Sequence, residues 1–412
     1  MAKSQTIVGL DIGSSKVACV VALKDESQNV LDIVGVGTAL TIGIRKGVIT
    51  DIDEVTKAID ESIDQAERMS GIPIEKVFVS ISGSHIESQN SRGVIAVSRA
   101  DGEISTDDVI RAIEAARAIS IPSNREILHV IPRNFIVDGQ EGIKDPMGMS
   151  GIRLEVEAHI ITGNISAMRN ITKTLFQSGI DISEIVFAPL ATSTILLSKQ
   201  QKELGVCLLD FGAQTTDMIA YEEGEILLSS SIPLGGANVT NDIAIGLRTS
   251  IQNAENIKKE YGYAISDHVN ESTQIDMKKY GDDEQRHTKQ YLAEIIEARL
   301  DEILLLASKE LKKIGKSGML PAGIVITGQG SKIPGILDLI KDRLKLPVEF
   351  SSIQNIGLAG MTDKINDSTF HCALGLTFYG SQKNSGQGFA YGVGYVGNVF
   401  LQIKKWLSHF LP

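Results

Sequence analysis

The sequence predicts an α/β fold of two lobes, and three observations support that prediction. A strand–turn–strand pattern occurs once in each half of the 412-residue chain, at 7–22 and again at 206–221. A third glycine turn, at 323–334, joins another apolar strand to the start of a helix. The two halves also carry insertions of different character, one rich in short strands and one helical. Two related halves of alternating strands and helices predict two α/β lobes that face each other.

Composition excludes several classes of protein. Hydrophobic residues make up 42% of the chain and charged residues 22%, as in an ordinary globular protein. The net charge of −11 argues against a general nucleic-acid binder, because such proteins need a basic face. The three cysteines, Cys19, Cys207 and Cys372, are few and far apart. They argue against a disulfide framework or a zinc site and indicate a reducing cytoplasm.

Apolar runs in this sequence are short. No segment approaches the roughly 20 apolar residues that span a bilayer. The apolar run at 7–10 stops at Asp11, too early for the core of a signal peptide. Any association with a membrane is therefore expected to be peripheral.

The first half is expected to form one lobe that is interrupted by an α+β insertion at 83–163. After the first hairpin, the apolar pattern predicts a strand, a helix capped by Asp51 or Asp53, and a second strand. The insertion is expected to hold short strands and one helix, and a helix and a strand then return to the lobe. These elements are expected at 30–38, 53–71, 76–82, 93–98, 107–119, 126–137, 153–161, 166–179 and 182–187, with an ordered loop at 139–151.

The second half is expected to carry a helical insertion. Helices are predicted at 237–249, 253–261 and 288–314, and apolar residues in the last of these follow the 3.6-residue period. The strand and turn that begin at residue 323 then lead into a helix with Pro334 in its first turn.

The C-terminal segment differs in composition from everything before it. Residues 381–396 are rich in Gly, Ser and Gln, which is typical of a flexible linker. Asn398 then caps a predicted amphipathic helix at 399–411, which is about 20 Å long and fits the membrane interface, not a span. The side chains expected to contact an anionic membrane surface are Val399, Phe400, Ile403, Lys404, Lys405, Trp406, Leu407, Phe410 and Leu411.

Two alternatives bear on this terminal helix. It either lies on a membrane or docks on the protein's own core, and its position after a linker favours the membrane. After the cost of ordering the helix, one such tail retains only a few kcal/mol and binds reversibly. A polymer of linked subunits would bind more tightly through avidity.

The two Asp-x-Gly turns have the chemistry of a phosphate and metal site. Glycine at Gly13 and Gly212 lets the backbone approach phosphate oxygens, and the amides at each tip can bind an anion. Asp11 and Asp210 are expected to hold Mg²⁺, mainly through water, because Mg²⁺ dehydrates reluctantly. Lys16 adds a positive charge toward a phosphate. The alternative is a pair of ordinary structural hairpins.

Other nucleotide motifs are absent from the sequence. There is no Gly-x-x-x-x-Gly-Lys-Ser/Thr, which excludes a P-loop NTPase. No Gly-x-Gly-x-x-Gly follows the opening strand, which argues against a Rossmann dinucleotide site.

These residues resemble the actin/Hsp70/sugar-kinase ATPase superfamily, which has a two-lobed actin-like (ribonuclease H-like) fold. Residues 9–22 resemble its first phosphate loop, 208–221 its second and 323–334 its adenosine loop. Within the superfamily the chain resembles the FtsA family of bacterial cell-division proteins, from about residue 6 to the end. The motifs that carry this narrower resemblance are His129-Val-Ile-Pro132, the Asp138–Leu154 segment, Lys46-Gly47-Val48-Ile49, Ala254-Glu255 with Lys258, and the linker with its terminal helix.

The resemblance implies a set of nucleotide contacts for ATP with Mg²⁺. Two of them, Glu255 and Lys258, would by spacing alone be a surface ion pair, and only the resemblance places them near the ribose and adenine. The residues implied to bind nucleotide are Gly13, Ser14, Ser15, Lys16, Gly212, Ala213, Gln214, Thr215, Thr216, Gly235, Gly236, Glu255, Lys258, Gly328, Gln329 and Gly330.

The chain departs from the family pattern at its loop tips. Ala213, Gln214 and Gln329 stand where glycine is common, and larger side chains there are expected to narrow the pocket or change the loops. No catalytic side chain is identified. Active relatives orient the attacking water with Gln or Glu after the last strand of the first half, where this chain has Phe187-Ala-Pro-Leu-Ala191. Slow or negligible hydrolysis is therefore expected.

The resemblance also implies a cellular role. Such a protein polymerises, tethers FtsZ filaments to the cytoplasmic face of the membrane at the septum, and helps to recruit later division proteins through its inserted subdomain. The helical insertion would bind the C-terminal peptide of FtsZ, with Lys289 and Arg299 near that surface, although solvated charges are an equal alternative. The rival interpretations are a type IV pilus-assembly protein, which lacks the terminal helix, and a generic actin/Hsp70-fold ATPase such as a sugar kinase or chaperone.

The expected organisation follows from these assignments. Lobe 1 is expected to be formed by three segments of the chain and lobe 2 by two segments. Each insertion is expected to be formed by one segment. The ranges are 1–82, 164–203 and 356–380 for lobe 1; 83–163 for the inserted subdomain; 204–240 and 314–355 for lobe 2; 241–313 for the helical subdomain; 381–396 for the linker; and 397–412 for the membrane helix.

Overall fold

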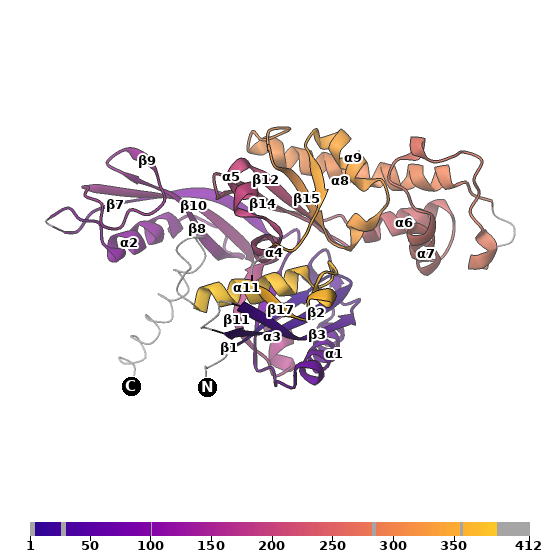
Figure 1. Cartoon of the computed structure of the whole chain (residues 1–412), viewed down its shortest axis with the longest axis horizontal. Coiled ribbons are helices and arrows are strands. Elements are labelled where there is room, and N and C mark those ends of the chain that lie inside the picture. The colour runs from indigo at the N-terminus through magenta and orange to yellow at the C-terminus, as the bar shows by residue number, and fades with distance from the viewer. Residues whose placement is uncertain (1–4, 26–29, 100, 282–285, 355–356, 385–412) are drawn as a thin grey trace.

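The computed structural model describes residues 5–25, 30–99, 101–281, 286–354 and 357–384. The predicted terminal helix and most of the predicted linker lie outside these residues. Figure 1 shows an elongated molecule, with two α/β lobes at its centre, a β-rich subdomain at one end and a helical subdomain at the other. The predicted two-lobed α/β class is confirmed.

The first lobe is built on a six-stranded sheet of order β11-β6-β1-β2-β3-β17. Strands β1 to β3 form an antiparallel meander, and β6 and β11 extend it in parallel with β1. The strands are β1 (Gln5–Ile12), β2 (Lys16–Asp25), β3 (Val30–Leu40), β6 (Lys76–Ile81), β11 (Asp181–Phe187) and β17 (Leu358–Gly360). Between β3 and the first helix lies the small hairpin of β4 (Ile44–Arg45) and β5 (Val48–Ile49).

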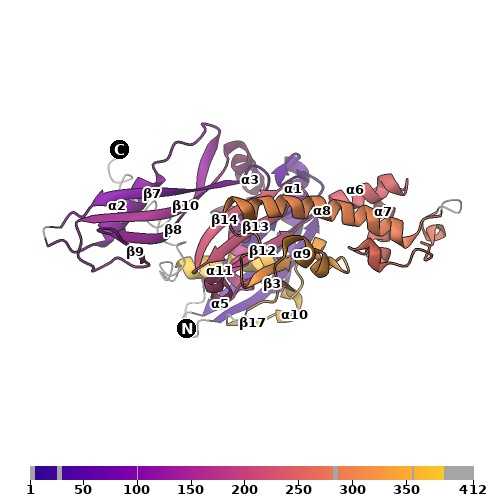
Figure 2. The same ribbon diagram turned by 90° about the horizontal axis from the view of Figure 1, so that it is seen from above.

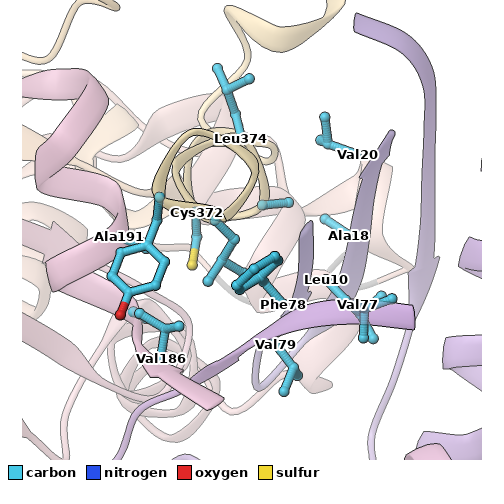
Figure 3. Close-up of a cluster of buried hydrophobic side chains, with 14 of the residues drawn as sticks. Leu10, Ala18, Val20, Val77, Phe78, Val79, Val186, Ala191, Cys372 and Leu374 are labelled. Atoms are coloured by element: carbon cyan, nitrogen blue, oxygen red, sulfur yellow. The ribbon is translucent and has the colours of Figure 1, made fainter. Parts of the chain in front are cut away.

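Four main helices belong to this lobe: α1 (Ile52–Ser70), α3 (Ile165–Gln177), α4 (Ala188–Leu196) and α11 (His371–Asn384), with the short α10 (Thr362–Ile365) before α11. Of the two predicted caps of α1, Asp51 is the one that accepts a hydrogen bond from the Glu54 amide, and Asp53 lies in the first turn. Gly71 ends the helix in the left-handed conformation. Buried side chains cover both faces of the sheet. Phe78 lies on the face that α11 covers, where a Cβ on Gly380 would be 2.4 Å from its ring, and Val79, the next residue of β6, points to the opposite face (Figure 3).

The second lobe repeats this topology in a five-stranded sheet of order β14-β13-β12-β15-β16. The meander β12–β14 is again antiparallel, and β15 and β16 again run parallel to the first strand. The strands are β12 (Val206–Phe211), β13 (Thr216–Glu222), β14 (Glu225–Ile232), β15 (Gly323–Thr327) and β16 (Val348–Phe350), and α5 (Lys199–Leu204) leads into them. The duplication read from the sequence is thus a duplication of sheet topology.

Helices α6 (Gly236–Gly246), α7 (Ile251–Tyr261) and α8 (Lys289–Lys313) form the helical end of the molecule, with 3₁₀ turns η1 (Ser266–His268) and η2 (Met277–Tyr280) between α7 and α8. Leu292, Ile296 and Leu300 of α8 are buried at the predicted helical spacing. The helix predicted at Pro334 begins later. A 3₁₀ turn, η3 (Gln329–Lys332), follows β15, and α9 (Ile336–Leu344) starts after Gly335.

The β-rich subdomain is a four-stranded antiparallel sheet of order β7-β10-β8-β9, with one helix packed on it. Its elements are β7 (Glu87–Ala96), α2 (Thr106–Arg117), β8 (Arg125–Val137), β9 (Gln140–Ile143) and β10 (Arg153–Asn164). The segment 139–151, predicted as a loop throughout, begins with β9, because a tight turn after Val137 brings Gln140 back beside it. Figure 2 shows this sheet and α2 at the end opposite α6 and α7.

The start of the predicted linker is also different from expectation. Helix α11 continues through Asn384, so residues 381–384 are helical. Lys24 donates to the Ser381 carbonyl at 2.7 Å, and Lys383 pairs with Glu184. These contacts with β2 and β11 hold the helix end against lobe 1. Among the described residues, no helix is both long enough and apolar enough to cross a bilayer.

Candidate functional site

The two Asp-x-Gly turns have the same backbone geometry. In the β1–β2 turn the Gly13 amide donates to the Lys16 carbonyl at 3.0 Å, and in the β12–β13 turn the Gly212 amide donates to the Thr215 carbonyl at 2.9 Å. Each Asp therefore stands at the end of a strand, next to a tight tip. Both turns are partly exposed, and Ser15 of the first is exposed.

Asp11 is surrounded by groups that favour its ionised form. The Ser80 hydroxyl of β6 donates to Asp11 Oδ1 at 2.7 Å and itself accepts from the Ile12 amide at 2.9 Å. Burial raises the pKa of Asp11 above its ordinary value, while Ser80, Cys372 and Lys16 act in the opposite direction. The carboxyl is thus held in one position by a hydroxyl from the neighbouring parallel strand.

Asp210 has acidic neighbours. It lies directly opposite Asp217 across the β12–β13 hairpin, and Asp11 approaches from the other lobe. Burial, Asp217 and Asp11 together raise the pKa of Asp210 to about 7. Burial likewise raises the pKa of Asp217 to about 6. A cation beside these carboxyls would relieve this repulsion, so the residues present fit a phosphate-bound metal ion.

The metal is not expected to be held by protein ligands alone. Among the described residues, no three His, Cys, Asp or Glu side chains lie close enough together to bind a metal ion. Asp11 and Asp210 would therefore contact a hydrated Mg²⁺ that is also bound by the nucleotide.

Lys16 turns toward the start of α11. Its Nζ donates to Thr369 Oγ1 at 2.6 Å. Burial lowers the pKa of Lys16, while Asp11, Asp367 and Asp210 favour its charged form. The ammonium therefore lies among three carboxylates at the level of the two turns.

The third glycine turn packs directly against the second. Gly328, at φ +88°, lies so close that a Cβ there would be 2.4 Å from the Phe211 carbonyl oxygen and 2.5 Å from Asp210 Oδ1. Thr327, just before it, is hydrogen-bonded to His371 Nδ1 of α11 at 2.9 Å. The adenosine-loop candidates Gly328 and Gly330 thus adjoin the second turn.

Gly235, Gly236, Glu255 and Lys258 also come together. The Gly236 amide donates to the Gly212 carbonyl at 3.0 Å, which joins the start of α6 to the second turn. Lys258 Nζ contacts Glu255 at 2.6 Å and donates to the Gly236 carbonyl at 3.2 Å. The pair predicted from the family resemblance is therefore not an isolated surface ion pair but is attached to the turn.

The loop-tip glutamines of lobe 2 reach segments of lobe 1. Gln214 Oε1 accepts from the Lys46 amide at 3.0 Å, and Gln329 Nε2 donates to Asp367 Oδ1 at 2.7 Å. Ala213 is fixed by its carbonyl, which accepts from the Ala237 amide at 2.7 Å. Both glutamine amides contact segments attached to the other lobe, and the expectation that these side chains narrow the pocket or change the loops stays a prediction.

Lys289 and Arg299 lie on α8, away from the turns. Lys289 Nζ lies over the Tyr261 ring at 4.9 Å. Arg299 makes a two-bond contact with Asp242 and a further contact with Glu302. An acidic peptide at this surface would meet a more available charge at Lys289 than at Arg299.

Several residues of this site were not singled out from the sequence. Ser80, Thr327, Thr369 and His371 come from distant segments, and nothing in their sequence neighbourhood signals a role. Asp217 is different, because the length of the predicted second turn places it opposite Asp210. The pairing of Asp217 with Asp210 was the one sign in the sequence that could have identified a further site residue.

The fold and this paired-turn site define the class of actin-like proteins. The chain is similar in structure to a PilM-PilN type IV pilus biogenesis complex (TM-score 0.66, 17% identity, 91% of this chain and 98% of that one). It is also similar to MreB5 of Spiroplasma citri bound to ADP (TM-score 0.55, 14% identity, 93% and 99%) and to a MamK double helical filament (TM-score 0.50, 12% identity, 91% and 98%). At these identities the likeness shows the fold alone.

Sequence comparison narrows the class. Residues 83–162 match the model of the SHS2 domain inserted in FTSA, and 207–375 match that of cell division protein FtsA. The chain is 38% identical to cell division protein FtsA of Pseudomonas aeruginosa, over 92% of this chain and 90% of that one. It is 41% identical to FtsA of Bacillus subtilis, over 87% and 81%. The chain belongs to the FtsA family of bacterial cell-division proteins.

Proposed function

We propose that this protein binds ATP with Mg²⁺ between its two lobes and uses the nucleotide as a conformational clamp. The observation that carries the proposal is the pair of matching turns, each with a tip amide and a half-buried carboxyl, which lie close together at the boundary between the lobes. Burial raises the pKa of Asp210 to about 7, as expected for a carboxyl in a binding site for a cation. MreB5 of Spiroplasma citri, which has a similar fold, is bound to ADP, and this supports nucleotide binding here.

Each group has a distinct part in this proposal. The tip residues Gly13 to Lys16 and Gly212 to Thr216 would bind phosphates from opposite sides. Asp11 and Asp210 would hold the hydrated Mg²⁺, whose charge would neutralise the phosphates. Gly235, Gly236, Glu255, Lys258 and Gly328 to Gly330 would line the ribose and adenine.

The binding proposal is tested with Lys16→Ala. Loss of the ammonium should weaken binding of a fluorescent ATP analogue about tenfold or more, since tenfold corresponds to about 1.4 kcal/mol. Lys57→Ala, which removes an exposed lysine of α1, is the matched control. Equal affinity in both variants would contradict the proposed site.

Turnover is expected to be slow. Helix α4 begins at Ala188, its first turn is buried, and it presents no carboxylate or amide to orient a water. A contaminant-free preparation should hydrolyse ATP at well under about 1 s⁻¹, the low end for ordinary enzymes. A faster rate that is lost in Lys16→Ala would show that another group orients the water.

We propose further that the protein polymerises and anchors FtsZ filaments to the cytoplasmic face of the cell membrane at the septum. Family membership and the MamK filament of similar fold support polymerisation. The sequence at 399–411 supports the anchor, since its apolar residues recur at helical spacing and Lys404 and Lys405 stand among the polar positions. Other division proteins are proposed to bind the inserted subdomain.

The anchor is tested by pelleting the protein with anionic vesicles. The full chain should sediment with vesicles that contain phosphatidylglycerol, and deletion of 397–412 should abolish this. Neutral vesicles and high salt are the controls, because the Lys404 and Lys405 attraction is electrostatic. Unchanged sedimentation of the deletion variant would refute the anchor.

The partner surface is tested on α8. Lys289→Glu should weaken binding of the FtsZ C-terminal peptide severalfold in a fluorescence anisotropy titration, because it reverses a charge beside the peptide. Lys312→Glu, at the other end of the same helix, is the control. Equal losses in both variants would indicate a general charge effect and no specific surface.

A further inference from the structure

Hydrogen bonds from side chains of one lobe reach the other lobe. Gln214 of the second turn accepts from the Lys46 amide in the β4–β5 hairpin at 3.0 Å. Gln329 of the third turn donates to Asp367 at 2.7 Å, and to Thr369 at 3.0 Å, just before α11. Both glutamines belong to lobe 2, and all three of these partners belong to segments attached to lobe 1.

The β4–β5 hairpin of lobe 1 is the part that contacts the second turn. Gly47, at φ +78°, packs so closely on lobe 1 that a Cβ there would be 2.4 Å from the Ser82 carbonyl oxygen. Ser82 itself donates to Asp217 Oδ2 at 2.5 Å, from the end of β6 to β13 of the other lobe. Gln214 and Asp217 therefore hold neighbouring points of lobe 1 from the same hairpin of lobe 2.

The segment before α11 is the part of lobe 1 that contacts the third turn. Thr369 accepts from Gln329 of lobe 2 and also from Lys16 of the first turn at 2.6 Å. Lys332, from the same 3₁₀ turn as Gln329, lies 3.5 Å from Asp367. A single short segment thus joins the first and third turns.

We propose that Gln214 and Gln329 form a latch that holds the two lobes together in the absence of nucleotide. The latch regulates the site named under the proposed function and rests on it only for its consequence for nucleotide exchange. A bound nucleotide would leave slowly, because the two amide contacts must break, together with Ser82–Asp217 and Thr327–His371, before the lobes separate.

The two contacts have opposite chemical requirements. Gln214 acts as an acceptor, so Gln214→Glu retains the contact with the Lys46 amide. Gln329 acts as a donor to a carboxylate, so Gln329→Glu places two negative charges together and breaks it. If the two glutamines were only polar side chains at the loop tips, Gln214→Glu and Gln329→Glu would have the same effect.

The test measures lobe separation directly, without nucleotide. Spin labels at Lys173→Cys on α3 and Lys341→Cys on α9 report the distance between lobes, and the three native cysteines are buried. The unmutated latch should give one narrow distance distribution. Gln214→Ala with Gln329→Ala should broaden and lengthen it, as should Gln329→Glu alone, whereas Gln214→Glu should leave it unchanged.

Gln65→Ala is the matched control. Its side chain also accepts from a backbone amide, that of Thr38 at 3.1 Å, but within lobe 1. The double alanine variant should also release a fluorescent ATP analogue about fivefold faster, the factor that corresponds to about 1 kcal/mol. Thermal unfolding of each variant identifies any that fail to fold, and Gln329→Glu provides a second route if the double variant does.

The outcomes separate the latch from the proposed function. An unchanged distance distribution in both the double variant and Gln329→Glu overturns the latch, whatever the nucleotide data show. Equal broadening in Gln65→Ala overturns it too. Failure of the unmutated protein to bind the ATP analogue overturns the proposed nucleotide site but leaves the distance measurement valid.

Discussion

The first and second Asp-x-Gly turns share a backbone and differ in what faces the carboxyl. In the β1–β2 turn, Asp11 stands opposite Ala18 and accepts a hydrogen bond from Ser80. In the β12–β13 turn, Asp210 stands opposite Asp217. Like charges directly opposite each other in a hairpin destabilise it. The duplicated fold therefore places one carboxyl beside a hydrogen-bond donor and the other opposite a second carboxyl.

The parallel strand beside each turn shows the same difference. Thr327 is paired with Asp210 in the β12–β15 register, and its hydroxyl contacts His371. Ser80 of β6 uses its hydroxyl on Asp11 instead. In lobe 1 this hydroxyl therefore binds the carboxyl of the turn, whereas in lobe 2 it binds His371 of α11. The comparison teaches that equal topology leaves the electrostatics of each turn free to diverge.

The largest expected effect comes from Gly328→Ala. The new Cβ would clash with the Phe211 carbonyl and with Asp210, so the second turn should lose about 3 kcal/mol of stability. Gly139→Ala is the control, because Gly139 has nearly the same φ, +89°, with open space around it, and should cost about 1–2 kcal/mol. Urea unfolding measures both, and equal losses would mean that the close approach has no energetic weight.

The next effect is a change in pH dependence with Asp210→Asn. The ordinary pKa of this carboxyl is 3.8, and burial with its acidic neighbours raises it to about 7 in the folded state. Between these pH values the folded protein holds a proton that the unfolded chain has lost, so this group's contribution to stability falls as pH rises. Asp210→Asn should reduce that fall between about pH 4 and 7.

Thermal unfolding of the nucleotide-free protein across that range measures it. Asp11→Asn is the comparison and should change the slope less, since Ser80, Cys372 and Lys16 oppose the effect of burial on the pKa of Asp11. A larger change for Asp11→Asn would reverse the contrast between the turns.

A smaller loss is expected for Ser80→Ala. It removes the donor to Asp11 and the acceptor of the Ile12 amide, which should cost about 1–2 kcal/mol. Ser80→Thr retains the hydroxyl and serves as the control in the same unfolding assay. If alanine and threonine behave alike, then the hydroxyl does not hold the first turn.

The smallest effect belongs to the counterpart residue, with Thr327→Ala. Its hydroxyl contacts His371 and not Asp210, so its loss should cost about 1 kcal/mol and leave the pH dependence of stability above pH 5 unchanged. Thr327→Ser is the control. A marked pH effect from Thr327→Ala would show that this hydroxyl supports Asp210 after all.

Local patterns in the sequence predicted most elements of the fold. The duplicated turns, the Asp51 cap and the apolar period of α8 each follow from short-range rules, and the structure confirms them. Strand β9 and the start of α9 were missed, because a turn after Val137 and a 3₁₀ turn after Gly328 leave weak local signals. The helical residues 381–384 were assigned to the linker because their composition hides contacts with β2 and β11.

The sequence by itself determined the family, the two-lobed architecture and the chemistry at the turn tips, because glycines and carboxylates act through their own backbone and charge. Only the tertiary structure decided which groups face those tips. Ser80 reaches Asp11, burial together with Asp217 raises the pKa of Asp210, and Gln214 and Gln329 reach the opposite lobe. These outcomes depend on strand register and on the approach of two lobes, and side chains so distant in sequence meet only after folding.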